Sequence, residues 1–177
     1  GSLKGMEQDG VLCFFGVPYA QKPLGALRFR APELVEPWDG VLAATGFAKD
    51  PMQANLTLGP ENYSEDCLYL NIWVPENVQS AAPVMLWVPG GAFATGGSGA
   101  LKPEGPTSYD CRQLAKDTGC IIVSISYRLN VFGFLNLSSF SSRFDDHIGM
   151  KDIIMAMRWV HDAISSFGGD PGNVTLF

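Results

Sequence analysis

The stretch PVMLWVPGGAFATGG, residues 83–97, decides the fold. Residues 84–88 form a nearly continuous apolar run, which is typical of a strand buried on both faces of a sheet. The run stops at Pro89, Gly90 and Gly91, where two residues without a Cβ allow a sharp turn and a close approach to another group. Backbone amides in such a turn can point at one spot and stabilise an oxyanion. An ordinary glycine turn at the end of a strand is the alternative interpretation.

The segments on either side of this stretch alternate between strand and helix patterns. Residues 108–117 have helical spacing, and residues 121–126 are a second continuous apolar run rich in β-branched side chains. Strand, helix and strand in this order predict a parallel βαβ unit. We expect earlier strands at residues 11–17 and 68–74 and a third apolar strand at 174–177.

A longer helix is predicted before the last strand, because apolar side chains there recur every three or four residues. Its expected buried face consists of Ile153, Met157, Val160, Ile164 and Phe167. The parallel strand that follows, at 174–177, needs neighbours on both sides, and an open α/β sheet places its chemistry at the carboxyl ends of such strands. We therefore expect residues 1–177 to be an incomplete N-terminal portion of a larger α/β domain.

Composition limits the classes of function. The 177 residues are 46% hydrophobic with a net charge of -6, so they can bury a sizeable core, and no basic patch suggests nucleic acid as a partner. No apolar run approaches the roughly 20 residues that span a bilayer. The four cysteines, at positions 13, 67, 111 and 120, lack the spacing of zinc or redox motifs. We expect no cofactor and no metal.

Glycosylation sequons bear on the cellular location. Asn55, Asn62 and Asn136 begin candidate sequons, and the first two fall in one polar loop. A fourth, at Asn173, opens an expected buried strand and is not expected to be used. These triplets favour a secreted protein or one in the lumen of the secretory pathway, with a cytoplasmic location as the alternative.

A phosphate-binding loop is a rival interpretation of the glycine-rich stretch. Gly91 and Gly96 have the spacing of such a loop. However, Gly97 stands where the phosphate-binding lysine belongs, and this argues against phosphate chemistry.

Five blocks in order along the chain resemble the type-B carboxylesterase family of α/β-hydrolases, which includes cholinesterases, liver-type carboxylesterases, bile-salt-activated lipase and fungal lipases. They are FFGVPYAQKPLGALRFRAPE (14–33), SEDCLYLNIWVP (64–75), PVMLWVPGGAF (83–93), SISYRLNVFGFL (124–135) and FGGDPGNVTLF (167–177). The loop 47–75 looks closest to the bile-salt-activated lipase branch. The resemblance implies the N-terminal part of an α/β-hydrolase fold, with a mostly parallel central sheet and flanking helices.

The resemblance also implies site residues. Gly91 and Ala92 would donate backbone N–H groups to an oxyanion, and Gly90 would shape the turn. The family's nucleophile elbow follows the block that ends at Phe177, so the catalytic triad is not in this chain. His147 and His161 are not at family catalytic positions and are expected to be structural or surface residues. We expect residues 1–177 alone to be inactive.

Two ion pairs and one cysteine follow from the same resemblance. Arg28 with Glu65, and Arg128 with Asp152, match pairs that are buried salt bridges in the family; four solvated charges are the alternative. Cys67 matches a cysteine of the family's first disulfide, whose partner position is Pro51 here, so that disulfide is expected to be absent.

Three classes of function remain open. The first is a serine hydrolase of carboxylic esters or acylglycerols. The loop 51–66 has no tryptophan for cation–π binding of a quaternary ammonium, which disfavours a choline esterase. The second is a family member without catalysis that serves as an adhesion or binding ectodomain, as neuroligins do. The third is a truncated product without independent function.

Overall fold

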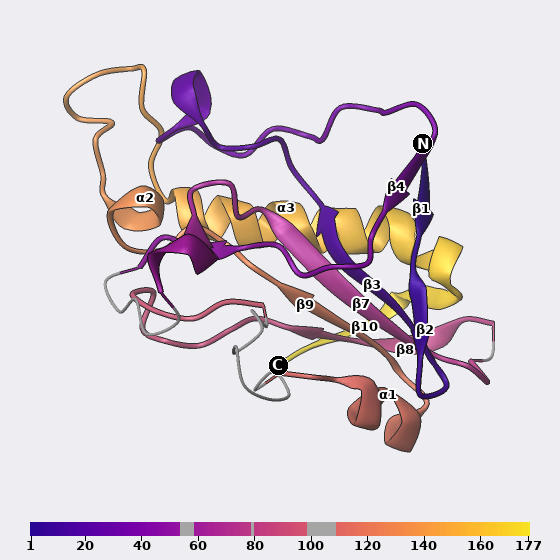
Figure 1. Ribbon diagram of the computed structural model, residues 1–177. Coiled ribbons are helices and arrows are strands. Elements are labelled where there is room, and N and C mark those ends of the chain that lie inside the picture. Colours follow the sequence, from indigo (N-terminus) through magenta and orange to yellow (C-terminus); the bar gives the residue numbers. More distant parts are fainter. Residues whose placement is uncertain (54–58, 79, 99–108) are drawn as a thin grey trace.

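Six strands form one mixed sheet through the centre of the computed structural model, which describes residues 1–53, 59–78, 80–98 and 109–177 (Figure 1). The strand order across the sheet is β10-β8-β9-β7-β3-β2. The strands are β2 (Met6–Gln8), β3 (Val11–Pro18), β7 (Tyr69–Pro75), β8 (Ala82–Trp87), β9 (Ile121–Ile125) and β10 (Gly169–Leu176).

Within the six-stranded sheet, parallel pairing is confined to β9, β8 and β10. The expected βαβ unit is confirmed, because β8 and β9 are parallel neighbours with Val84 opposite Ile121. The other three pairs, β2 with β3, β3 with β7 and β7 with β9, are antiparallel, so the sheet within this chain is mixed rather than mostly parallel. A two-residue turn joins the antiparallel strands β2 and β3, and the chain reverses direction between β7 and β8.

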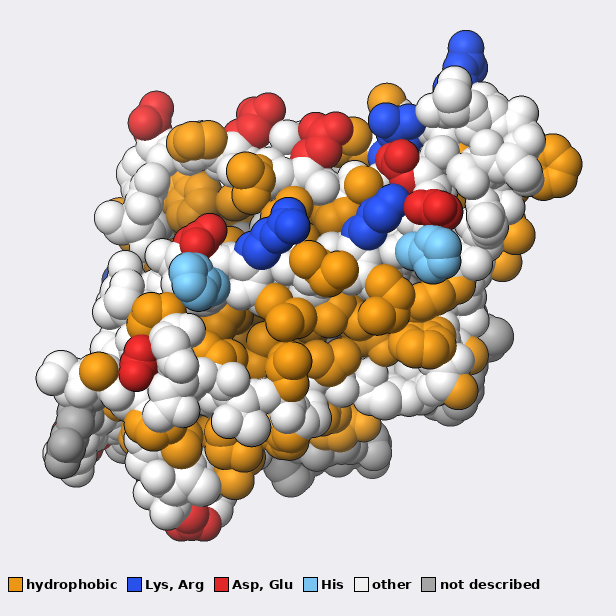
Figure 2. Space-filling view, turned by 180° about the vertical axis from the view of Figure 1, so that it is seen from behind, with side chains coloured by type: hydrophobic (Ala, Val, Ile, Leu, Met, Phe, Trp, Pro, Cys, Tyr) orange, Lys and Arg blue, Asp and Glu red, His pale blue; other side chains and the backbone are white. Residues whose placement is uncertain are grey.

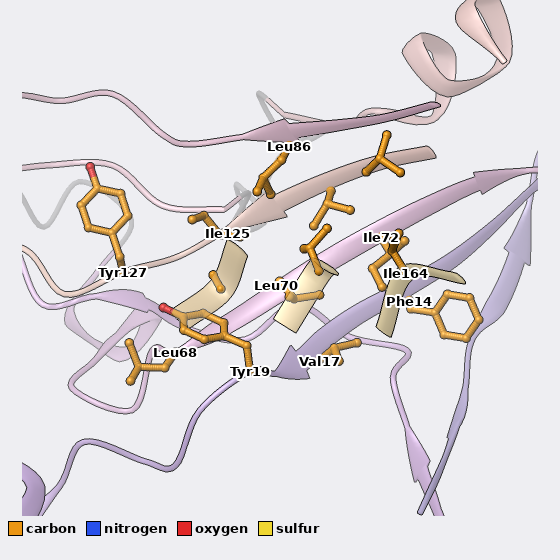
Figure 3. Close-up of a cluster of buried hydrophobic side chains, with 14 of the residues drawn as sticks. Phe14, Val17, Tyr19, Leu68, Leu70, Ile72, Leu86, Ile125, Tyr127 and Ile164 are labelled. Carbon is orange, nitrogen blue, oxygen red and sulfur yellow. The ribbon is translucent and has the colours of Figure 1, made fainter. Parts of the chain in front are cut away.

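Helices cover both faces of the sheet. Helix α3 (Ile148–Ala163) and the 3-10 turn η3 (Ile164–Phe167) lie along one face, at the back in Figure 1. The larger core lies beneath them, and Figure 3 shows Leu70, Ile72 and Leu86 of the strands in one cluster with Ile164. Helix α1 (Arg112–Thr118) packs on the opposite face, where its Ala115 belongs to a second core with Trp73. Burial on both faces explains the continuous apolar runs.

The buried face of α3 differs in one position from the periodicity that predicts it. Ile153, Val160 and Ile164 are buried as expected, but Met157 is 37% exposed. It lies with Met150 and Ile154 on the outer side of the helix. Figure 2 shows hydrophobic side chains across this face of the molecule. The helix is apolar on more than one side, so periodicity alone could not assign Met157.

Shorter elements complete the chain. Two small parallel pairs flank the main sheet, β1 with β4 and β5 with β6. The short elements are β1 (Ser2–Lys4), β4 (Val41–Ala43), β5 (Asp50–Pro51), β6 (Tyr63–Ser64), η1 (Gly25–Leu27), η2 (Pro60–Asn62) and α2 (Asn130–Phe134). Gln53, just after β5, and Asn130, at the start of α2, matter for function, because both form hydrogen bonds with the segment that follows β8.

Candidate functional site

The segment after β8 forms a tight left-handed turn. Gly91, Ala92 and Phe93 have φ values of +130°, +53° and +59°. The N–H groups of Ala94 and Thr95 both donate to the carbonyl of Gly91, at 3.0 and 3.1 Å. Two successive non-glycine residues in the left-handed region are unusual, since each costs roughly 1–2 kcal/mol. Such strain persists where surrounding contacts fix the backbone, and it concentrates at functional sites.

Glycine is required at positions 91 and 96 of this turn. A Cβ on Gly91 would lie 2.0 Å from the Thr95 carbonyl oxygen, and a Cβ on Gly96 would lie 2.6 Å from the Gly90 oxygen. Gly90, which the family resemblance assigns to shaping the turn, has open space where a Cβ would lie. The turn therefore depends on glycine at 91 and 96 rather than at 90.

The N–H groups of Gly91, Ala92 and Phe93 are not used to hold the turn together. All three residues are exposed, and among the described residues no acceptor is hydrogen-bonded to their N–H groups. The peptide between Gly91 and Ala92 is trans, so its N–H points opposite to the Gly91 carbonyl, which is bonded inside the turn. Unpaired amides of this kind can bind an anion or an oxyanion.

A phosphate-binding loop is incompatible with this geometry. Gly97 stands where the lysine of such a loop belongs, and a Cβ there would lie 1.9 Å from a carboxylate oxygen of Asp50. A side chain at this position would have to displace the Asp50 carboxylate, and the neighbouring charge is negative. The rival interpretation of the glycine-rich stretch is therefore excluded.

The turn lies at the carboxyl ends of the parallel strands, where open α/β sheets place their chemistry. The hydroxyl of Tyr127, just after β9, donates to the Pro89 carbonyl at 2.9 Å and holds the entrance of the turn. Figure 3 shows this side chain at the edge of the core. The base of the turn is thus fixed by a residue from the neighbouring strand.

A buried polar network anchors the far end of the segment. Asn71 of β7 accepts from the Gly16 N–H at 2.9 Å and donates to the Ser98 carbonyl and the Ser124 hydroxyl, each at 3.1 Å. The Ser98 N–H donates to the hydroxyl of Ser126. Sequence reasoning did not select Asn71, although a polar residue inside an apolar strand was a usable signal.

The Arg128–Asp152 pair is buried and bidentate. The Nε and Nη2 atoms of Arg128 donate to the two carboxylate oxygens of Asp152 at 2.8 and 2.6 Å, and the side chains are 3% and 0% exposed. The Arg128 backbone N–H adds a third bond at 3.1 Å. This pair fastens the segment after β9 to helix α3.

The Arg28–Glu65 pair is present but is not buried. Its Nη2–Oε1 distance is 2.6 Å, and the Arg28 side chain is 46% exposed. The expected pairing is confirmed, but within this chain the pair is not buried as it is in the family, because Arg28 follows the surface turn η1. Its pKa is raised by the hydrogen bond and charge of Glu65.

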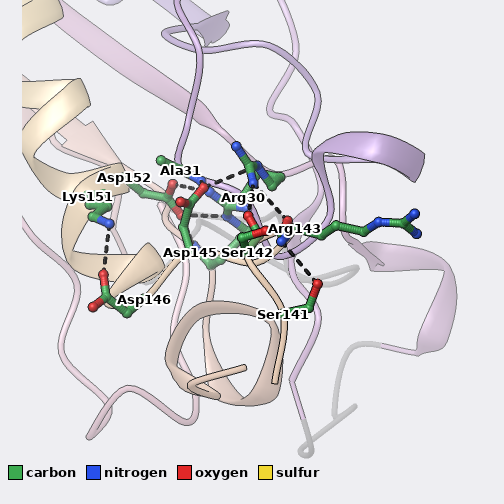
Figure 4. Close-up of polar contacts among 10 residues, drawn as sticks. Arg30, Ala31, Ser141, Ser142, Arg143, Asp145, Asp146, Lys151 and Asp152 are labelled. Carbon is green, nitrogen blue, oxygen red and sulfur yellow. Dashed lines mark hydrogen bonds and ion pairs between the residues drawn. The ribbon is translucent and has the colours of Figure 1, made fainter. Parts of the chain in front are cut away.

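A cluster of surface contacts joins the segment before α3 to the early chain. Asp145 pairs with Arg30 at 3.2 Å and accepts from the Ala31 N–H at 2.8 Å, and Lys151 pairs with Asp146 at 3.0 Å. Figure 4 shows these contacts beside Asp152. They hold the start of α3 over the long irregular segment after β3.

The remaining titratable candidates do not form a reactive centre. His147 and His161 have side chains 74% and 72% exposed, each beside an aspartate. Cys67 is a buried free thiol whose pKa burial raises well above its usual value, so the nucleophilic thiolate is suppressed. Within the described ranges, no group of three or more His, Cys, Asp or Glu side chains is placed to hold a metal ion.

The candidate sequons fall in different settings. Asn55 lies outside the described residues. Asn62 ends η2 and is half-buried, whereas Asn136 is exposed and accepts from the Ser138 N–H. Asn173 is also exposed, because β10 lies at the edge of the sheet in this chain rather than between two strands. Over the part of the chain that the structure describes, no helix is long and apolar enough to cross a membrane.

Known proteins resemble this chain over its whole length. It is 43% identical to the para-nitrobenzyl esterase of Bacillus subtilis, over 100% of this chain and 36% of that protein. Carboxylesterase 1E of Mus musculus is 38% identical over 99% of this chain and 32% of its own length. A solved thermophilic PNB esterase superposes with a TM-score of 0.89 at 42% identity, covering 99% of this chain and 36% of that structure.

The chain thus spans about a third of the length of these relatives. The α/β-hydrolase fold expected from the sequence is confirmed by the solved esterases. The relatives named here are esterases, which does not favour the adhesion alternative. Because the carboxylesterase family model matches all of residues 1–177, this chain belongs to the carboxylesterase family.

Proposed function

We propose that residues 1–177 are the N-terminal portion of a longer carboxylic ester hydrolase, and that the turn after β8 is part of its oxyanion hole. The N–H groups of Gly91 and Ala92 would bind the oxyanion of the tetrahedral intermediate. The single observation that supports this most directly is the strained turn with unpaired amides at the carboxyl end of β8. Family membership supplies the reaction class.

Such a site stabilises the transition state of ester hydrolysis more than it stabilises the bound ester. Negative charge develops on the carbonyl oxygen only as the nucleophile attacks, so fixed amide donors bind the transition state better than the ester. The strain in the turn is already present in the free protein, and the donors need no rearrangement when the charge forms. Residues 1–177 would supply these donors, and the nucleophile, acid and base would come from the rest of the protein.

Small carboxylic esters are the proposed substrates. The name of the Bacillus relative points to para-nitrobenzyl esters as a first test, and acylglycerols are a second class to examine. The test is to express the full-length protein and measure hydrolysis of para-nitrobenzyl acetate, together with labelling by a fluorophosphonate. Turnover with stoichiometric labelling of one serine outside residues 1–177 is expected. A folded full-length protein with neither turnover nor labelling would refute the proposal.

A further inference from the structure

Two amide side chains from outside the turn hold its carbonyl side. The Nε2 of Gln53 donates to the Gly96 carbonyl at 2.8 Å, and the Gly96 N–H donates back to Oε1 at 3.1 Å. Asn130, the first residue of α2, donates its backbone N–H to the Phe93 carbonyl at 2.8 Å. Its Nδ2 donates to the Ala94 carbonyl at 2.9 Å. Gln53 and Asn130 lie far apart in the sequence but contact the same turn.

Peptide geometry carries the influence of Asn130 to the unpaired amides. The carbonyls of Phe93 and Ala94 share their planar peptides with the N–H groups of Ala94 and Thr95. Both of those N–H groups donate to the Gly91 carbonyl. That carbonyl in turn shares its peptide with the Ala92 N–H. By fixing two carbonyls, Asn130 therefore fixes the direction of the Ala92 N–H, although it does not contact it.

Gln53 acts on the other proposed donor in the same way. Its amide binds both polar groups of Gly96, and the Cα of Gly96 lies against the Gly90 carbonyl so closely that a Cβ would meet that oxygen at 2.6 Å. The Gly90 carbonyl shares its peptide with the Gly91 N–H. A displaced Gly96 would let this peptide rotate and turn the Gly91 N–H away from its direction.

The contacts of Asn130 and Gln53 hold a strained backbone in place. Ala92 and Phe93 hold left-handed φ values that an unsupported chain would leave, because the right-handed or extended regions are lower in energy. Asn130 itself has a φ of +51°, which asparagine tolerates better than most residues. Its Nδ2 also donates to the Met52 carbonyl at 3.3 Å, next to Gln53. The two amides thus join one network around the turn.

We propose that Asn130 and Gln53 are positioning residues for the oxyanion turn. This inference rests on the proposed function. Neither side chain is assigned a contact with substrate; each acts by holding the backbone whose amides receive the charge. Misplaced amides weaken binding of the transition state more than binding of the ester. Substitution of either residue should therefore lower kcat more than it changes KM.

The test uses three variants of the full-length protein with para-nitrobenzyl acetate. Asn130→Gly keeps the left-handed backbone and its donor to Phe93 but removes Nδ2. Asn130→Asp has the same shape, but its carboxylate cannot donate to the Ala94 carbonyl. Gln53→Glu keeps the acceptor for the Gly96 N–H and loses the donor. We expect kcat to fall by about 10- to 10²-fold in Asn130→Asp and Gln53→Glu and by less in Asn130→Gly, with KM changed by less than about threefold.

Asn77→Asp is the matched control, because it makes the same chemical change at an exposed residue after β7, at the other end of the sheet. Hydrogen exchange of residues 89–98 supplies a readout that needs no activity. Faster exchange at Ala94, Thr95 and Gly96 in Asn130→Asp, but not in Asn77→Asp, is expected. An active protein whose Asn130→Asp and Gln53→Glu variants keep normal kcat and exchange would overturn this inference alone. A folded full-length protein with no esterase activity would overturn the proposed function and the catalytic role of both residues.

Discussion

Asp152 and Arg128 form a buried, bidentate ion pair that links helix α3 to the segment after β9. Two residues beyond Arg128, Asn130 contacts the oxyanion turn. The ion pair therefore holds α3 against the sheet and also holds the backbone segment that carries Asn130.

Removing one partner of this pair should destabilise the protein strongly. Asp152→Ala would leave the Arg128 guanidinium buried without its counter-charge, and we expect a loss of about 3–5 kcal/mol in the free energy of unfolding. Denaturant unfolding of the full-length protein measures this. Glu65→Ala, which breaks the exposed Arg28 pair, should cost far less, because solvent screens that pair. Equal losses in the two variants would contradict the assigned difference in burial.

The main strands and the long helix could be predicted from the sequence because the order of apolar and polar residues reflects which side chains are buried. Residues 84–88 and 121–126 are apolar on both faces, and the structure places them as neighbouring parallel strands. The antiparallel pairs could not be predicted in the same way, since a strand such as β7 shows its burial in its sequence but not its direction. Met157 shows where periodicity fails. When a helix has apolar residues on several sides, their spacing does not indicate which side is buried.

The candidate site was predicted only in part. The glycines after β8 locate the turn, but the left-handed φ values of Ala92 and Phe93 arise from tertiary contacts that no local pattern encodes. Gln53 and Asn130 lie in unremarkable polar positions, and their partners are backbone atoms rather than complementary side chains. Asn71 was detectable as a polar residue in an apolar strand, but its bond to Ser98 depends on how the segment after β8 folds back.

The network around Asn71 should behave cooperatively. Asn71→Leu leaves the Gly16 N–H without its acceptor and should cost about 1–3 kcal/mol in unfolding free energy. The Ser98 carbonyl keeps one donor in that variant, the Ser124 hydroxyl at 2.9 Å. Ser124→Ala alone likewise leaves one donor, whereas the double variant leaves none. A double-mutant cycle by denaturant unfolding should therefore show a loss greater than the sum of the single losses, and strict additivity would count against the network.

The free cysteines should differ in reactivity towards alkylating reagents. Burial raises the pKa values of Cys13 and Cys111 to about 11 and that of Cys67 well above its usual value, so little thiolate forms at pH 8. Cys120 is partly exposed. With iodoacetamide at pH 8, mass spectrometry of the folded full-length protein should find Cys120 modified first and Cys13 and Cys67 last. All four should react at similar rates in denaturant, and rapid alkylation of Cys67 in the folded state would contradict its placement.

The proposed oxyanion donor can be tested by replacing the Ala92 N–H with an oxygen atom, which keeps the side chain and the length of the backbone but also makes the Gly91 carbonyl a weaker acceptor for Ala94 and Thr95. Proline is a poor choice, because Gly91 and Ala92 have φ values of +130° and +53°, and proline requires about -65°. Replacing Ala92 with lactic acid converts its amide to an ester and keeps the methyl group. We expect kcat of the full-length protein to fall by about 10²–10³-fold with little change in KM. Ala92→Gly is the control: it keeps the N–H and relieves the strain of a positive φ, so its kcat should stay near the normal value. Normal kcat in a well-folded lactic acid variant would show that the Ala92 amide does not bind the oxyanion.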